Sequence, residues 1–86
     1  MFYVYILKSQ KNQELYIGST NNLEKRLAEH NSGKSGYTKK YMPYELIYYE
    51  VYKSEPDARK REGNLKLRAN ALSQTKRRIV ESLKTD

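Results

Sequence analysis

Three apolar runs, each with aromatic or β-branched members, are separated by polar segments along this chain. The first, at 2–7, is apolar at every position, which is typical of a strand buried on both faces of a sheet. A turn-like polar stretch leads to a second run at 15–18, and this spacing predicts a β-hairpin. The third run, at 46–52, predicts another strand.

The hairpin brings two tyrosines together if its register is simple. Side chains alternate along a strand, so pairing of Lys8 with Leu15 puts Tyr5 and Tyr16 on the same face of the sheet. The register itself is assumed at this level.

Capping residues and apolar spacing predict three helices. The first runs from Asn22 to about Asn31 and stops near Gly33. The second begins at Ser54, with Pro56 in its first turn, and runs to about Leu72. The third is capped by Ser73 and runs to about Lys84, with an apolar face of Ile79, Val80 and Leu83.

The first two predicted helices carry polar residues where apolar ones are expected. At 100° per residue, the stripe of Leu23 and Leu27 also contains His30, with Arg26 on its shoulder. In the second helix the stripe is formed by Ala58, Leu65, Ala69 and Leu72, and it contains Glu62.

A carboxylate on a core-facing stripe is costly unless it meets a cation, a metal or several hydrogen-bond donors. One interpretation is structural: Glu62 forms a buried ion pair with Arg26, and His30 is a hydrogen-bonded core residue. The other interpretation is that these residues form a site for chemistry. Arg59, Arg61 and Lys66 offer surface pairing to Glu62, but they do not explain its place on the stripe.

Composition narrows the chemistry further. The chain has 17 Lys and Arg against 10 Asp and Glu, a formal net charge of +7, so a polyanion such as nucleic acid is the expected partner. It has no Cys, which excludes disulfides, thiolate zinc sites and Cys nucleophiles. No apolar run approaches the length of a membrane span or a signal peptide, so we expect a cytoplasmic protein, with residues 1–86 as one domain.

These residues, in this order, resemble the GIY-YIG nuclease family. The signature reads Tyr3-Val4-Tyr5, then Tyr16-Ile17-Gly18, then Arg26 and His30 in Arg-Leu-Ala-Glu-His, and finally Glu62. The resemblance extends from about residue 2 to residue 66. It is greatest to small stand-alone members and to the amino-terminal domain of excinuclease C. The first triplet departs from the family pattern, because Tyr and Val stand where Gly and Ile are usual.

The resemblance implies an α+β fold, a three-stranded antiparallel sheet flanked by three helices. It also implies metal-dependent hydrolysis of phosphodiester bonds in DNA, with a place in repair or recombination. Glu62 would hold one divalent ion, Mg²⁺ or Mn²⁺, and Arg26 would neutralise the scissile phosphate. Tyr16 and His30 would position water and phosphate. Either Tyr5 or His30 would serve as the base.

Nucleic-acid contacts are expected from the basic loop 33–44, where lysines alternate with tyrosines that can stack on unpaired bases. The resemblance to the family also implies close approach of the backbone at Gly18. The candidate contact residues in the loop are Lys34, Tyr37, Thr38, Lys39 and Lys40, with Tyr41 and Tyr44 nearby; Lys76, Arg77 and Arg78 form a second candidate contact, against a plain solvated helix face. Asn64 and Asn70 are both candidates for a further site residue.

Three function hypotheses remain open from the sequence. An endonuclease that recognises the structure of DNA, rather than a base sequence, needs Glu62. A non-catalytic nucleic-acid-binding module has no use for a carboxylate that repels phosphate. A purely structural protein would leave the net charge unexplained. The altered first triplet and the absence of a second binding domain predict activity that is weak or depends on a protein partner, and DNA is favoured over RNA.

Overall fold

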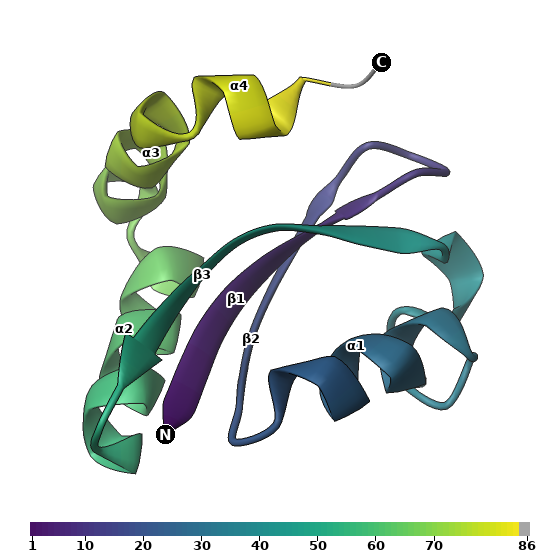
Figure 1. Ribbon diagram of the computed structural model, residues 1–86. Coiled ribbons are helices and arrows are strands. Elements are labelled where there is room, and N and C mark those ends of the chain that lie inside the picture. Colours follow the sequence, from purple (N-terminus) through teal and green to yellow (C-terminus); the bar gives the residue numbers. More distant parts are fainter. Residues whose placement is uncertain (85–86) are drawn as a thin grey trace.

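In the computed structural model, which describes residues 1–84, the three apolar runs form one antiparallel sheet (Figure 1). The strands β1 (Phe2–Ser9), β2 (Leu15–Thr20) and β3 (Tyr44–Tyr52) lie in the order β2-β1-β3. β1 is central, which explains why Val4, Tyr5, Ile6 and Leu7 are almost completely buried. Lys8 pairs with Leu15, as was assumed for the hairpin, and the α+β class is confirmed.

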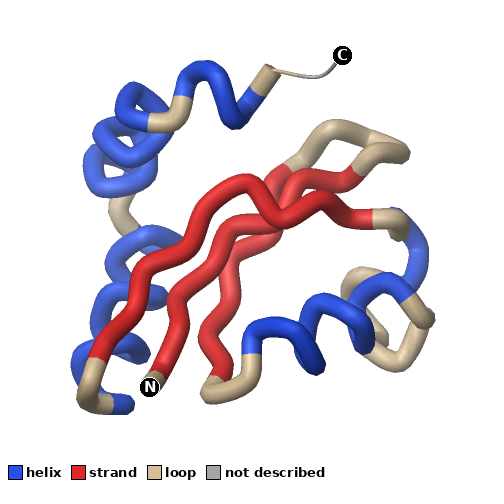
Figure 2. Tube along the Cα trace, in the orientation of Figure 1, coloured by secondary structure: helices blue, strands red, loops and turns tan. Residues whose placement is uncertain are grey.

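Helices cover the two faces of this sheet, and the tube view in Figure 2 shows the strands between them. α1 (Leu23–Asn31) packs on the face formed by Tyr5, Leu7 and Tyr44. α2 (Glu55–Leu67) and α3 (Ala69–Arg78) pack on the opposite face, which is formed by Val4, Ile6 and Ile17. The two outer strands are therefore edges at which residues from both layers can meet.

Local signals set the limits of α1 and of the loop behind it. Asn22 caps the helix, because its side-chain oxygen accepts a hydrogen bond of 3.1 Å from the Lys25 amide, and Gly33 follows the helix end with φ 81°. The loop contains one turn of 3-10 helix, η1 (Lys39–Tyr41). Its two ends are joined: Tyr44 donates its amide to Asn31 Oδ1 at 2.6 Å, and Asn31 Nδ2 donates to the Tyr44 carbonyl at 3.0 Å. β3 consequently begins at Tyr44, two residues earlier than predicted.

The carboxyl-terminal half differs from the prediction of two helices that meet at Leu72 and Ser73. The chain is extended at Arg68 (φ −119°, ψ 106°), and Ser73 lies inside α3. The break turns α3 back, so that Leu72 packs on the core, whereas Ala69 is exposed. A second break at Ile79 separates the four-residue α4 (Val80–Leu83). No Gly or Pro marks either break.

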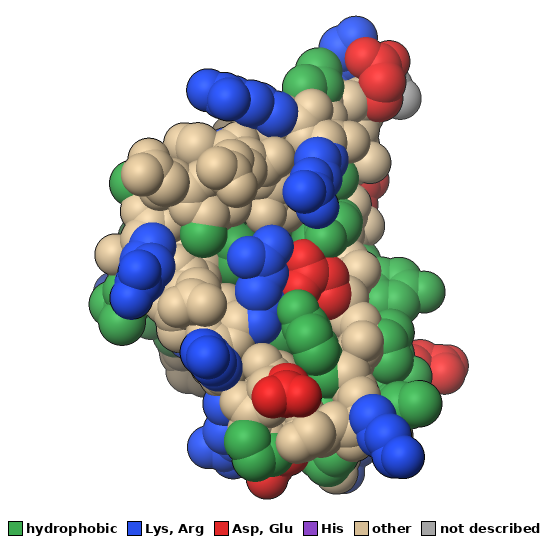
Figure 3. Space-filling view, turned by 90° about the vertical axis from the view of Figure 1, so that its left-hand side faces the viewer, with side chains coloured by type: hydrophobic (Ala, Val, Ile, Leu, Met, Phe, Trp, Pro, Cys, Tyr) green, Lys and Arg blue, Asp and Glu red, His purple; other side chains and the backbone are tan. Residues whose placement is uncertain are grey.

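The outer surface of α2 and α3 carries many Lys and Arg side chains (Figure 3). None of the helices within residues 1–84 combines the length and apolar character that crossing a lipid bilayer requires.

An ionic network at the β3 edge holds α2, α3 and the sheet together. Arg61 donates from Nε and Nη2 to the two carboxylate oxygens of Glu50 at 2.9 and 3.0 Å, and Nη2 also donates to Thr75 Oγ1 at 3.1 Å. The hydroxyls of Tyr48 and Tyr52 donate to the same carboxylate. Arg61 is thus committed to Glu50 and does not pair with Glu62. Burial alone would raise the pKa of Glu50, but these donors bring that pKa below its ordinary value.

Replacing Arg61 with Met is expected to lower the free energy of unfolding by roughly 2 kcal/mol, because Glu50 would lose its two charged donors. The wild-type protein should lose the contribution of Glu50 as pH falls through the pKa of this carboxyl, since a group with a lowered folded-state pKa stabilises only while it is ionised. Urea unfolding followed by circular dichroism at several pH values measures both effects.

The matched control is Arg59→Met. Arg59 is largely exposed and reaches Glu55 at 3.4 Å, so its loss should change stability by less than about 0.5 kcal/mol. Equal stability losses in the two variants would show that the network does not hold the layers together.

Candidate active site

Three aromatic rings from three elements meet on the α1 side of the sheet. Tyr5 on β1 and Tyr16 on β2 have ring centroids 6.4 Å apart, and the imidazole of His30 on α1 lies 5.8 Å from Tyr5 and 4.9 Å from Tyr16. The strand register explains the tyrosine pair, because Leu7 pairs with Tyr16 and Tyr5 pairs with Gly18. The helix stripe explains His30, which has no exposed surface.

A chain of hydrogen bonds runs inward from the phenol of Tyr5. The phenol oxygen lies 2.9 Å from His30 Nε2, and His30 Nδ1 lies 2.8 Å from Thr38 Oγ1. The Thr38 hydroxyl donates to the carbonyl of Ser35 at 3.4 Å. Because this hydroxyl has one proton, it accepts from Nδ1–H, and His30 Nε2 then accepts the phenol proton of Tyr5.

Burial and charge keep both groups neutral near pH 7. Burial lowers the pKa of His30 to about 4, and the nearby Arg26 guanidinium adds to this effect. Burial, with a smaller contribution from Tyr16, raises the pKa of Tyr5 to about 12, although Arg26 acts in the opposite direction. His30 therefore has a free lone pair on Nε2, directed at the phenol.

Gly18 provides the space that the phenol occupies. A Cβ atom at this position would lie 2.6 Å from Cζ of Tyr5 and closer still to the phenol oxygen. Because Gly18 has no side chain, the ring of Tyr5 can pack directly against its backbone. The sequence pattern does not indicate this role.

Glu62 approaches the same edge strand from the α2 side. Its Oε1 accepts a hydrogen bond of 2.6 Å from Ser19 Oγ, and its Oε2 accepts one of 2.7 Å from Lys66 Nζ. Ser19 follows Gly18 on β2, and consecutive residues of a strand face opposite sides of the sheet. The carboxylate of Glu62 and the phenol of Tyr5 therefore approach β2 from opposite faces of the sheet. Burial would raise the pKa of Glu62, but Lys66 and Ser19 bring it below its ordinary value, and its charge acts on Tyr5. The buried ion pair with Arg26 is wrong as an interpretation, because Arg26 bonds Glu29 at 3.1 Å.

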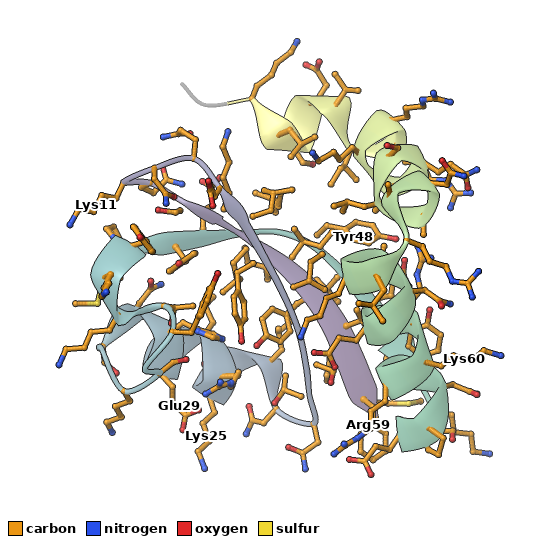
Figure 4. All side chains as sticks on the ribbon, turned by 180° about the vertical axis from the view of Figure 1, so that it is seen from behind. Lys11, Lys25, Glu29, Tyr48, Arg59 and Lys60 are labelled. Carbon is orange, nitrogen blue, oxygen red and sulfur yellow. The ribbon has the colours of Figure 1, made fainter. Side chains whose placement is uncertain are left out.

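The remaining sequence candidates divide into exposed and buried residues. Tyr37 is 74% exposed, with its ring centroid 5.7 Å from that of Tyr16. Thr38 has no exposed surface and so offers nothing to a nucleic acid in this structure. The exposed cations are Lys34, Lys39 and Lys40 in the loop and Lys76, Arg77 and Arg78 on α3. In Figure 4, Lys25 and Glu29 on α1 extend away from the sheet.

Two participants were missed in the sequence. Ser19 was detectable, because its alternation with Gly18 puts it on the face covered by α2. Ser35 contributes only its backbone carbonyl, which no residue pattern identifies. Neither Asn64 nor Asn70 is joined to the site: the Asn64 carbonyl caps the end of α2, and Asn70 is an exposed residue of α3.

Thr38→Val is expected to reduce the preference of His30 for the Nδ1–H tautomer. In this variant Nδ1–H has no acceptor, which destabilises that tautomer by about 1–2 kcal/mol. Thr38→Ser keeps the hydroxyl and should keep the tautomer. His30 is the one histidine of the chain, so ¹⁵N–¹H correlation spectra of the imidazole report it without overlap. An unchanged tautomer in the Val variant would mean that Thr38 does not orient the ring.

The chain is similar in sequence to a known family of proteins. Residues 1–77 match the model of the GIY-YIG catalytic domain. A UPF0213 protein of Clostridium perfringens is 46% identical over 67 residues, which cover 77% of this chain and 71% of the relative. One of Staphylococcus haemolyticus is 46% identical over 65 residues, which cover 74% and 78%.

A solved structure gives the same result. The solution NMR structure of a UPF0213 protein from Bacillus halodurans is similar with a TM-score of 0.54 and 31% identity, covering 87% of this chain and 82% of that one. The chain therefore belongs to the GIY-YIG family and is one of its small UPF0213 proteins.

Proposed function

We propose that this protein is an endonuclease that uses Mg²⁺ or Mn²⁺ to hydrolyse phosphodiester bonds in DNA, and that it recognises the structure of the DNA and not a base sequence. One observation carries the proposal: Glu62 bonds Ser19 on one face of β2, while Tyr5, whose phenol bonds His30, packs against the adjacent Gly18 on the other face. A protein that only binds nucleic acid gains nothing from a carboxylate at this position.

The donor set fits a hard cation that retains most of its water. Mg²⁺ takes oxygen ligands and is often bound by one or two carboxylates together with water and substrate phosphates. Within residues 1–84 there is no group of three or more His, Cys, Asp and Glu side chains that could hold a metal, so water and substrate phosphates would complete the coordination that Glu62 begins. A bound divalent ion supplies Lewis-acid stabilisation of the charge that develops on the leaving oxygen.

Tyr5 and His30 provide a route for the proton of the attacking water. His30 has no exposed surface and Tyr5 is 1% exposed, so His30 would act through the phenol to which it is bonded. As the water gives its proton to the Tyr5 oxygen, the phenol proton passes to His30 Nε2, and an imidazolium results. This order assigns the contact with water to Tyr5 and the storage of the proton to His30. The water oxygen bonds to phosphorus as the bond between phosphorus and the leaving oxygen breaks, and solvent protonates the leaving oxygen. The imidazolium then returns its proton to solvent through Tyr5.

Arg26 and the basic loop would hold the substrate. The Arg26 side chain is one-third exposed and lies close enough to Tyr5 to oppose the rise in the phenol pKa, so a phosphate bound to it would lie beside the phenol. Lys34, Lys39 and Lys40 are exposed and can contact the flanking phosphates. These contacts are to the backbone, which is why we expect little dependence on base sequence.

Glu62→Gln should abolish metal-dependent nicking of supercoiled and branched DNA, with a loss of at least about 100-fold, because the amide lacks the charge that holds a divalent cation. Product formation with and without Mg²⁺ or Mn²⁺, quantified on gels, is the measurement. Circular dichroism should show that the variant is folded, since Glu62 is partly exposed.

Asp57→Asn is the matched control. It removes an exposed carboxylate from the same helix and should retain wild-type nicking. Nicking that persists in Glu62→Gln would remove Glu62 from the mechanism. DNA binding without metal-dependent nicking in the wild-type protein would favour the non-catalytic binding module.

A further inference from the structure

A groove of about 490 Å³ opens beside the candidate active site, between β2, the loop after α1, and the helices α2 and α3. Leu15, Leu65 and Leu72 supply its apolar lining, Tyr16 and Tyr37 its aromatic lining, and Lys66 its charge. It is small for a protein helix and adequate for one nucleotide.

Tyr37 is the unusual member of this lining. Its side chain is 74% exposed, although one of its neighbours is the ring of Tyr16, at 5.7 Å with a tilt of 37°. The phenol is thus supported by a second ring while most of its surface remains open to solvent. A supported, exposed ring is what a base-stacking platform requires.

The groove adjoins the ring cluster of Tyr5, Tyr16 and His30, which is called the cluster below. Tyr16 contacts Tyr37 in the groove and the imidazole of His30 in the cluster, where the centroids are 4.9 Å apart. Lys66 lines the groove and bonds Glu62 at 2.7 Å. A ligand in the groove therefore lies next to a phosphate held at the cluster.

The charge around the groove favours nucleic acid over an apolar peptide or a second copy of the chain. Lys66 lines the groove, and residues 55–78, which span α2 and α3, contain eight basic residues against three acidic ones, Glu55, Asp57 and Glu62. One of the eight, Arg61, is bound to Glu50 at the β3 edge. Figure 3 shows basic side chains spread over the α2–α3 surface, where two copies would repel each other.

The geometry points to a substrate with an unpaired nucleotide. We assign the groove as the binding site of a nucleobase that stacks on Tyr37, beside the phosphate to be cleaved; the assignment rests on the proposed nuclease function. In a duplex both faces of a base are already covered by its neighbours, so only a single-stranded, gapped or flipped nucleotide offers a face to the tyrosine.

Binding without metal tests this assignment independently of cleavage. Fluorescence anisotropy in EDTA compares a labelled single strand with the same sequence as a duplex. Tyr37→Ala should weaken single-strand binding by about 10-fold or more and duplex binding by less than about twofold, whereas Tyr37→Phe should bind like the wild type. The salt dependence of binding should stay the same in all three proteins, because no charge is removed.

Tyr49→Ala is the matched control, since Tyr49 is 50% exposed on β3, at the opposite edge of the sheet. It should not change binding of either DNA. A strand carrying 2-aminopurine should be quenched by the wild type and by Tyr37→Phe, but not by Tyr37→Ala.

Three outcomes overturn the assignment: equal affinity of Tyr37→Ala and wild type for the single strand, equal losses on single strand and duplex, or a dimer in sedimentation that Tyr37→Ala dissociates. Absence of nicking together with the expected binding pattern would refute the proposed nuclease and leave the groove as a base-binding site. Nicking by a protein whose Tyr37→Ala variant binds normally would refute the groove alone.

Discussion

The ring of Tyr5 occupies the volume that a side chain at position 18 would fill. The arrangement of the candidate site depends on this close packing of Tyr5 against Gly18. A Cβ atom at position 18 would displace the phenol, and with it the bond to His30 Nε2. The glycine of the second signature triplet therefore has a steric explanation within the protein. Glycine is required at position 18 because Tyr5 of the neighbouring strand packs against it, whether or not a substrate is bound.

The candidate site and the ionic network lie at opposite edges of the three-stranded sheet. The β2 edge carries Tyr16, Gly18 and Ser19, whose partners are uncharged rings and the carboxylate of Glu62. The β3 edge carries the network around Glu50 and Arg61, which fixes α2 and α3 to the sheet. Because Glu62 is the next residue of α2 after Arg61, the structural ion pair also determines where the candidate metal ligand lies.

Much of the fold was predictable because its signals are local. The unbroken apolar run at 2–7 predicted a strand buried on both faces, which is β1, and the pairing of Lys8 with Leu15 that was assumed for the hairpin is the one observed. The helical arithmetic put His30 with Leu23 and Leu27, and α1 buries that stripe against the sheet.

The failures are tertiary in origin. The break at Arg68 has no Gly, Pro or capping side chain, and the packing of Leu72 on the core and the Arg61–Thr75 bond favour it. Thr38 looked like one more polar residue in a basic loop, yet it is buried because its hydroxyl serves an imidazole from another element. Arg26 was a plausible partner for Glu62 by charge alone, but its own helix offers Glu29 one turn later.

The paired hydrogen bonds between Asn31 and Tyr44 have an effect at a distance from both residues. They tie the loop at its base, and the stretch between them supplies Thr38 to the inner side of the imidazole and Tyr37 to the outer side of Tyr16. The side-chain amide of Asn31 therefore helps to position both the buried hydroxyl of Thr38 and the exposed ring of Tyr37.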